Sequence, residues 1–239
     1  MRYMKKKLKW IIPVFVLGLI IAVFLIYTGT YYHADATARA ALQSDETVSV
    51  VQTEYGWFFD GPSEENLLVF YPGAKVEETA YAPLLHGLAD QGMDVCLVKM
   101  PFRLAVFGAE KANDVLALYD HENKYIGGHS MGGAMAANYA SEHGGQLSGV
   151  ILFAAYPTKP LDDHLILLSI YGSEDGVLNM GKVSEGREYA PSNYFESVIE
   201  GGNHAQFGSY GAQKGDGTAR ISAEEQLQLT IEFISQNVR

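Results

Sequence analysis

The chain has 239 residues, 48% of them hydrophobic, which is enough for one globular domain with a buried core. Its formal net charge is −11, but the first nine residues carry five of the 17 Lys and Arg and no acid, leaving 12 basic against 28 acidic residues. This acidic body excludes the electrostatic footprint of a nucleic-acid-binding protein. The single cysteine, Cys96, excludes an intrachain disulfide, and its apolar surroundings predict a buried, inert thiol.

The N-terminus is predicted to anchor the chain in a membrane. Residues 1–9 form a basic segment, and residues 10–27, WIIPVFVLGLIIAVFLIY, form an apolar run. This run spans roughly 27 Å as a helix at ~1.5 Å per residue, close to the thickness of a hydrocarbon core. Trp10 and Tyr27 occupy the positions of interfacial aromatic residues. The positive-inside rule then predicts a single-pass protein of the cell membrane, with residues 1–9 cytoplasmic and the rest extracytoplasmic.

A cleaved signal peptide is the alternative for this region. Ala34–Ala36 and Ala36–Ala38 both resemble small-residue cleavage sites. However, the apolar run is longer than the ~7–15 residues usual in signal peptides, and these sites lie rather far beyond it. We therefore expect an uncleaved anchor over residues 10–27, with cleavage left open. Residues 28–46 are interpreted as a linker or a short juxtamembrane helix, and residues 47–239 as one globular domain.

From residue 47 onward, strand-like runs alternate with helix-length segments. The later strand-like runs are continuously apolar, as expected when helices cover both faces of a sheet. Two early strands that can form a hairpin, followed by this alternation, predict an α/β fold with an eight-stranded, mostly parallel sheet flanked by helices. The expected strands are residues 47–54, 55–60, 66–73, 94–101, 124–128, 149–156, 164–172 and 193–202, and the expected helices are 76–92, 109–122, 130–145, 179–190 and 222–238.

One serine lies in a pattern typical of a catalytic nucleophile. Gly128–Gly132 reads GHSMG, which matches G-x-S-x-G, and it follows an expected strand and opens an expected helix. This context is that of a nucleophile elbow, a sharp turn that holds the serine in a strained conformation. Gly128 and Gly132 remove side chains that would collide there. The start of the helix also directs N–H groups toward an oxyanion formed beside Ser130.

A serine hydroxyl needs a base, and in such folds the order along the chain is serine, acid, histidine. Glu174 and Asp175 lie in a turn after an apolar strand, and His204 lies in a glycine-rich loop after the next strand. Both turns should open at the same edge of the parallel sheet as Ser130. We expect His204 to be the base, while the residues alone leave Asp175 and Glu174 open as the acid. His129 is adjacent to the serine and is expected to point away from it.

The oxyanion requires two N–H donors. One is expected from Met131, directly after the serine, and the other from the loop after the third strand. In that loop Pro72 has no N–H, which makes Ala74 the expected donor and Lys75 the alternative. The chain has no HExxH motif, no Cys/His cluster and no Walker-type loop, so neither a metal nor another cofactor is expected.

These motifs give residues 48–239 a resemblance to the α/β-hydrolase superfamily, in particular to its compact dienelactone-hydrolase-like branch and to bacterial hydrolases with an N-terminal anchor. The resemblance implies Ser130, Asp175 and His204 as a triad, with Ala74 and Met131 as oxyanion donors. Dienelactone hydrolases proper use a cysteine nucleophile, so their substrate is not carried over, and Pro72–Gly73 replaces the more usual His–Gly. The matching motifs, in order, are YPGAKVE, LVKMPF, GGHSMGG, YGSEDGV and GGNHAQFGSYG.

The expected function is that of a membrane-anchored serine hydrolase that cleaves carboxylic esters through an acyl-enzyme. Residues 157–164 are too few for a cap domain between two strands, which favours small or short-acyl esters. The glycine-rich residues 207–221 are expected to form a mobile flap. An acyltransferase or thioesterase with the same triad, or an anchored binding module without activity, are the alternatives. No nucleic-acid partner is expected.

Overall fold

The computed structural model describes residues 2–238, and its contacts divide the chain into a unit that ends at Tyr31 and a unit that begins at Tyr32. The first unit is one helix, α1 (Arg2–Gly29), with Pro13 inside it. Its window Ile12–Gly29 has a mean hydropathy of 2.5 and is only 6% buried. An exposed apolar helix of this length is typical of a membrane anchor or of a signal sequence.

The second unit is built on an eight-stranded sheet with the order β1-β2-β4-β3-β5-β6-β7-β8. β2 pairs antiparallel with β1 and β4, and all other neighbours are parallel. The sequence-based expectation of an eight-stranded, mostly parallel α/β sheet is therefore confirmed. The strands are β1 (Ser49–Gln52), β2 (Gly56–Asp60), β3 (Asn66–Tyr71), β4 (Met93–Val98), β5 (Asn123–His129), β6 (Gly149–Phe153), β7 (Ile166–Gly172) and β8 (Asn193–Ile199).

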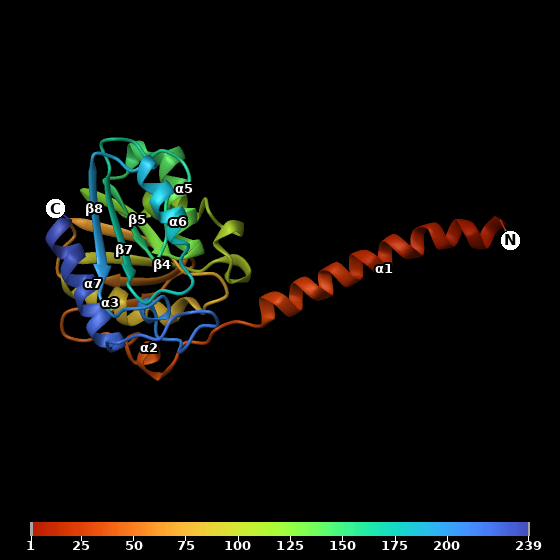
Figure 1. The fold of residues 1–239 in the computed structure, drawn as a ribbon, viewed down its shortest axis with the longest axis horizontal. Coiled ribbons are helices and arrows are strands. Elements are labelled where there is room, and N and C mark those ends of the chain that lie inside the picture. Colours follow the sequence, from red (N-terminus) through yellow and green to blue (C-terminus); the bar gives the residue numbers. More distant parts are fainter. Residues whose placement is uncertain (1, 239) are drawn as a thin grey trace. The chain divides into compact units, whose positions relative to one another are not determined.

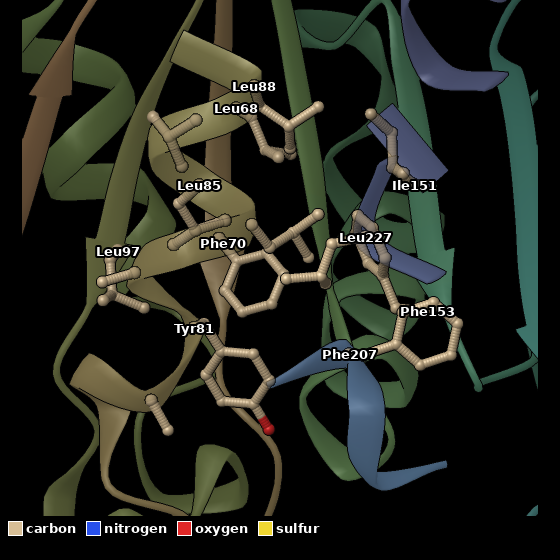
Figure 2. Packing of buried hydrophobic residues seen from close by; sticks show 14 of the residues in the cluster. Leu68, Phe70, Tyr81, Leu85, Leu88, Leu97, Ile151, Phe153, Phe207 and Leu227 are labelled. Carbon is tan, nitrogen blue, oxygen red and sulfur yellow. The ribbon is translucent and has the colours of Figure 1, made fainter. Parts of the chain in front are cut away.

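Helices cover both faces of this sheet (Figure 1). Strand β3 shows why, because its alternate side chains enter two separate buried clusters. Leu68 and Phe70 pack on one face with α3 (Ala82–Asp90) and α7 (Ala223–Asn237), as Figure 2 shows for part of that cluster. Leu67, Val69 and Tyr71 pack on the other face with α4 (Lys111–Leu118) and α5 (Met131–His143). A strand buried on both faces is continuously apolar, as the sequence showed. The helix α6 (Met180–Gly186) follows β7.

The segment just after Tyr31 is packed into the second unit. Residues 28–46 were interpreted as a linker or short helix, and the structure contains the short helix α2 (Ala36–Ala40), whose Ala38 is fully buried. Tyr32 forms a parallel bridge to Val76: its N–H donates to the Lys75 carbonyl at 2.8 Å, and its own carbonyl accepts from Glu77 N–H at 2.8 Å. The backbone of Tyr32 is thus bonded to the loop that follows β3.

The loops after the parallel strands gather at one edge of the sheet. The connection from β6 to β7, residues 154–165, contains no helix, so nothing of cap size is inserted there. The expectation of a mobile flap over residues 207–221 meets a different arrangement at its start. Phe207 is fully buried, Tyr210 is nearly so, and Ser209 N–H donates to the Ala80 carbonyl at 2.7 Å. Two aromatic side chains therefore hold this glycine-rich segment on the core.

The central position of β3 gives a test of the core. Leu68→Ala should lower the free energy of unfolding by about 2–5 kcal/mol, because a fully buried leucine is replaced and a cavity remains. Val51→Ala is the matched control on the edge strand β1, where the side chain is 52% exposed, and it should change that free energy by only about 0.5 kcal/mol. Denaturant unfolding of the full chain in detergent measures both, and equal losses would contradict this view of the core.

Candidate active site

Ser130 lies in a strained turn between β5 and α5. Its φ and ψ of 55° and −122° are unusual for a residue other than glycine, and its N–H donates to the Phe153 carbonyl at 2.9 Å. The turn packs tightly against β3. A Cβ on Gly128 would lie 2.4 Å from the Tyr71 carbonyl oxygen, and one on Gly132 would lie 2.2 Å from it. Both glycines are needed because backbone stands where their side chains would be.

The structure brings Asp175 to His204. Asp175 Oδ2 lies 2.8 Å from His204 Nδ1, and both side chains are only 1% exposed. The other carboxylate oxygen, Oδ1, accepts from the N–H groups of Val177 at 2.8 Å and Leu178 at 2.7 Å. A buried carboxylate with both oxygens bonded holds its position firmly and fixes the orientation of the imidazole.

Glu174, the alternative acid, faces elsewhere. Its carboxylate lies 2.6 Å from the Arg220 guanidinium and its side chain is 32% exposed. Arg220 also pairs with Glu200 at 2.6 Å, so Glu174 belongs to a surface ion-pair group. The structure therefore places Asp175, and not Glu174, beside the histidine.

The second nitrogen of His204 remains open. His204 Nε2 is buried and has no hydrogen-bond partner among the described residues. Within residues 2–238, no hydrogen bond joins this nitrogen to the Ser130 hydroxyl. Hydrogen bonds between a catalytic base and its nucleophile often tighten only when substrate binds. A buried nitrogen without a partner is costly, which marks this atom as a candidate to exchange a proton with a bound molecule.

The loop after β3 leaves one N–H free. Gly73 N–H donates to the Tyr81 hydroxyl at 3.0 Å, and Lys75 N–H donates to the Arg103 carbonyl at 2.9 Å. Pro72 has none, so within the described residues only Ala74 of this loop offers an unbonded N–H. Met131 is the first residue of α5, where an N–H has no acceptor inside the helix. The two expected donors therefore keep their N–H groups available, and Lys75 does not.

Two side chains that the sequence did not single out as functional support His204. His129 ends β5, is 1% exposed, and its Nε2 lies 3.1 Å from the His204 carbonyl oxygen. Burial, with a further contribution from nearby His204, lowers the pKa of His129 well below its usual value. Asp216 accepts from His204 N–H at 3.2 Å and from Ala205 N–H at 2.8 Å, and it also accepts from Gly176 N–H at 3.1 Å. Asp216 thus joins the loop of Asp175 to the loop of His204.

Ser130, Asp175 and His204 lie outside three other reactive or hollow features of the described residues. Burial raises the pKa of the Cys96 thiol to about 12, so it is protonated at neutral pH. Glu110, Glu142 and His143 approach one another closely enough to hold a cation, but Glu110 precedes α4 and the other two lie at the C-terminal end of α5, away from the three residues. A hollow of about 1420 Å³ is lined by residues around α2, by α3 and α7, and by Asn203 and parts of residues 205–219; its lining includes Asp216 but not Ser130, Asp175 or His204.

The comparisons with known proteins identify a family and several solved structures of similar fold. A family model described as "Alpha/beta hydrolase family" matches residues 67–228. Among solved structures, a monoacylglycerol lipase from Paleococcus ferrophilus is similar at a TM-score of 0.59 and 13% identity, covering 80% of this chain and 99% of its own. A search of the curated proteins found no match.

Two further structures resemble the chain to a similar degree. A predicted CIB-like hydrolase from Thermoplasma acidophilum has a TM-score of 0.58 and 16% identity, covering 79% of this chain and 99% of its own. The carboxylesterase CesB from Bacillus subtilis has a TM-score of 0.52 and 10% identity, covering 84% and 93%. At these identities the likeness is one of fold.

Proposed function

This chain belongs to the α/β-hydrolase family, and we propose that within it the protein is a serine hydrolase that cleaves carboxylic esters. The observation that carries the proposal is the buried His204–Asp175 pair, 2.8 Å apart, at the edge of the sheet where the strained Ser130 follows β5. Structural neighbours that carry the names of a monoacylglycerol lipase and a carboxylesterase support the choice of ester substrates.

The proposed mechanism assigns one task to each group. His204 Nε2 takes the proton from the Ser130 hydroxyl as the oxygen attacks the ester carbonyl, and Asp175 holds the imidazole in the required tautomer. The N–H groups of Ala74 and Met131 donate to the oxyanion. His204 then gives the proton to the departing alcohol, which leaves an acyl group on Ser130. Water, activated by the same base, releases the acid.

The nucleophile and the acid can be tested together. Ser130→Ala should lower kcat by a factor on the order of 10⁶ and abolish labelling by an organophosphonate probe, because the attacking oxygen is gone. Asp175→Asn should lower kcat by a smaller factor, on the order of 10⁴, since the histidine loses its carboxylate partner. Glu174→Gln is the matched control at the neighbouring position and should be nearly silent.

Each other outcome of this experiment has a distinct meaning. A wild-type chain without phosphonate label would point to an anchored binding module. Label without ester hydrolysis would favour an acyltransferase or thioesterase. A loss with Glu174→Gln but not with Asp175→Asn would move the acid to Glu174.

The substrate is proposed to be a small or short-acyl ester. The connection from β6 to β7 has no helix that could cover the serine, and the large hollow beside α7 does not reach the triad residues. Each buried methylene of an acyl chain contributes ~0.8 kcal/mol to binding only where the protein encloses it. An open site therefore gains little from long chains.

Acyl-chain length provides the measurement. On p-nitrophenyl esters, kcat/KM should be highest for short acyl chains and should show no jump at the micellar threshold of the substrate. A steady increase toward long acyl chains would contradict the proposal and indicate a lipase.

The helix α1 is proposed to be an uncleaved anchor that holds the catalytic unit outside the cytoplasm. The support is its exposed apolar length, preceded by five basic residues and no acid. Protease added to intact cells should remove the catalytic unit, and high salt should not extract the full chain, because apolar burial and not charge retains it. Protection of the unit in intact cells would reverse the topology, and release of a shortened soluble chain would indicate cleavage.

A further inference from the structure

We propose that Tyr81 and His129 are positioning residues. They connect the loop directly after β3, residues 72–75, called here the oxyanion loop, to the base His204 through one hydrogen-bond network. The network runs from Gly73 N–H to the Tyr81 hydroxyl at 3.0 Å, from that hydroxyl to His129 Nδ1 at 2.8 Å, and from His129 Nε2 to the His204 carbonyl at 3.1 Å. This inference rests on the proposed function, since it gives these two residues a role in the same reaction.

The direction of every bond follows from what each group can donate. The His204 carbonyl can only accept, so His129 Nε2 must carry a proton. Because burial keeps the His129 ring neutral, its Nδ1 has a lone pair and must accept from the Tyr81 hydroxyl. Burial also raises the pKa of Tyr81, so that hydroxyl keeps its proton. The Tyr81 oxygen uses a lone pair to accept from Gly73 N–H. Each of the three hydrogen bonds in the network therefore has one defined donor and one defined acceptor.

Burial makes this hydrogen-bond network rigid. Tyr81 is fully buried and its ring lies 5.1 Å from that of Phe70, while its hydroxyl points away from the apolar cluster, as Figure 2 shows. A Cβ on Gly73 would lie 2.7 Å from the Tyr81 oxygen and 2.8 Å from His129 Nδ1. The oxyanion loop therefore rests directly on the two side chains.

The hydrogen-bond network has one consequence at the oxyanion loop and another at His204. At the loop, Tyr81 takes the Gly73 N–H, which leaves the next N–H, that of Ala74, for the oxyanion. At the base, His129 holds the backbone of His204 from one side while Asp216 holds it from the other. The two imidazole centroids are 4.4 Å apart. A neutral His129 avoids placing a like charge beside His204 when the latter takes up a proton during the reaction.

A purely structural role would produce a different result from a positioning role. Loss of a buried hydroxyl lowers stability wherever it occurs, but only a positioning group lowers kcat in the folded protein with little change in KM. Tyr139 provides the matched control: it is buried, donates to Asn113 Oδ1 at 2.7 Å and accepts from Gln146 Nε2 at 2.7 Å. Its hydroxyl has the same donor-and-acceptor pattern without contact to the oxyanion loop or to His204.

The first measurement is steady-state hydrolysis of a short-acyl p-nitrophenyl ester by the full chain in detergent. Tyr81→Phe should lower kcat about tenfold with KM within about twofold, because the transition state loses the fixed loop that donates to it. Tyr139→Phe should leave both constants unchanged at a similar loss of stability. His129→Gln, whose amide can still donate to the His204 carbonyl, should retain more activity than His129→Phe. A kcat for Tyr81→Phe equal to that of wild type would overturn the positioning role.

The second measurement does not depend on activity. In the full chain with ¹⁵N-labelled histidine, NMR should show His129 as the neutral tautomer with its proton on Nε2 from pH 5.5 to 8. Tyr81→Phe should shift the Nδ1 resonance of that ring, and Tyr139→Phe should not. A proton on Nδ1, or titration of His129 in this range, would contradict the proposed hydrogen-bond network and leave the esterase proposal untouched. If the wild-type protein takes no phosphonate label, the proposed function is overturned. The hydrogen-bond network then has no role in positioning catalytic groups.

Discussion

The contact on which this catalytic unit depends is the close approach of the turn after β5 to the end of β3. A strained backbone such as that of Ser130 costs about 1–3 kcal/mol and persists only where the surroundings enforce it. Here the surroundings are the carbonyl of Tyr71, against which Gly128 and Gly132 pack without side chains. Because the strands are parallel, the loops that carry the acid and the histidine open at the same edge and are arranged around this turn.

Much of this arrangement could be predicted from the sequence because it is local. Apolar runs of strand length indicated all eight strands, and the G-x-S-x-G pattern at a strand end indicated Ser130. The choice between two adjacent acids was beyond the residues alone. The turn after β7 determines which of the two lies beside His204: Asp175 accepts from two backbone N–H groups of that turn and from the imidazole, while Glu174 reaches Arg220 on the surface. The resemblance to a known family favoured Asp175 for the same position.

What the sequence did not indicate depends on approaches between distant segments. Tyr81 and His129 are 48 positions apart, and His129 and His204 are 75 apart, so no spacing rule joins them. Asp216, between two glycines, had the pattern of an ordinary turn. The expectation of a mobile flap gave weight to the glycines of residues 207–221. At the start of this segment the burial of Phe207 and Tyr210 outweighs them, since each aromatic ring removes a large apolar area from water.

The bridge between Tyr32 and Val76 bears on how the chain can be processed. A peptidase that cut after Ala36 would remove Tyr32, and with it both backbone bonds that secure the segment directly after the oxyanion loop. It would also remove the ring that lies 5.5 Å from that of Tyr210. Cleavage at that site would therefore take two backbone hydrogen bonds from the segment after β3 and one aromatic neighbour from Tyr210. A cut on the N-terminal side of Tyr32 would keep all of these contacts.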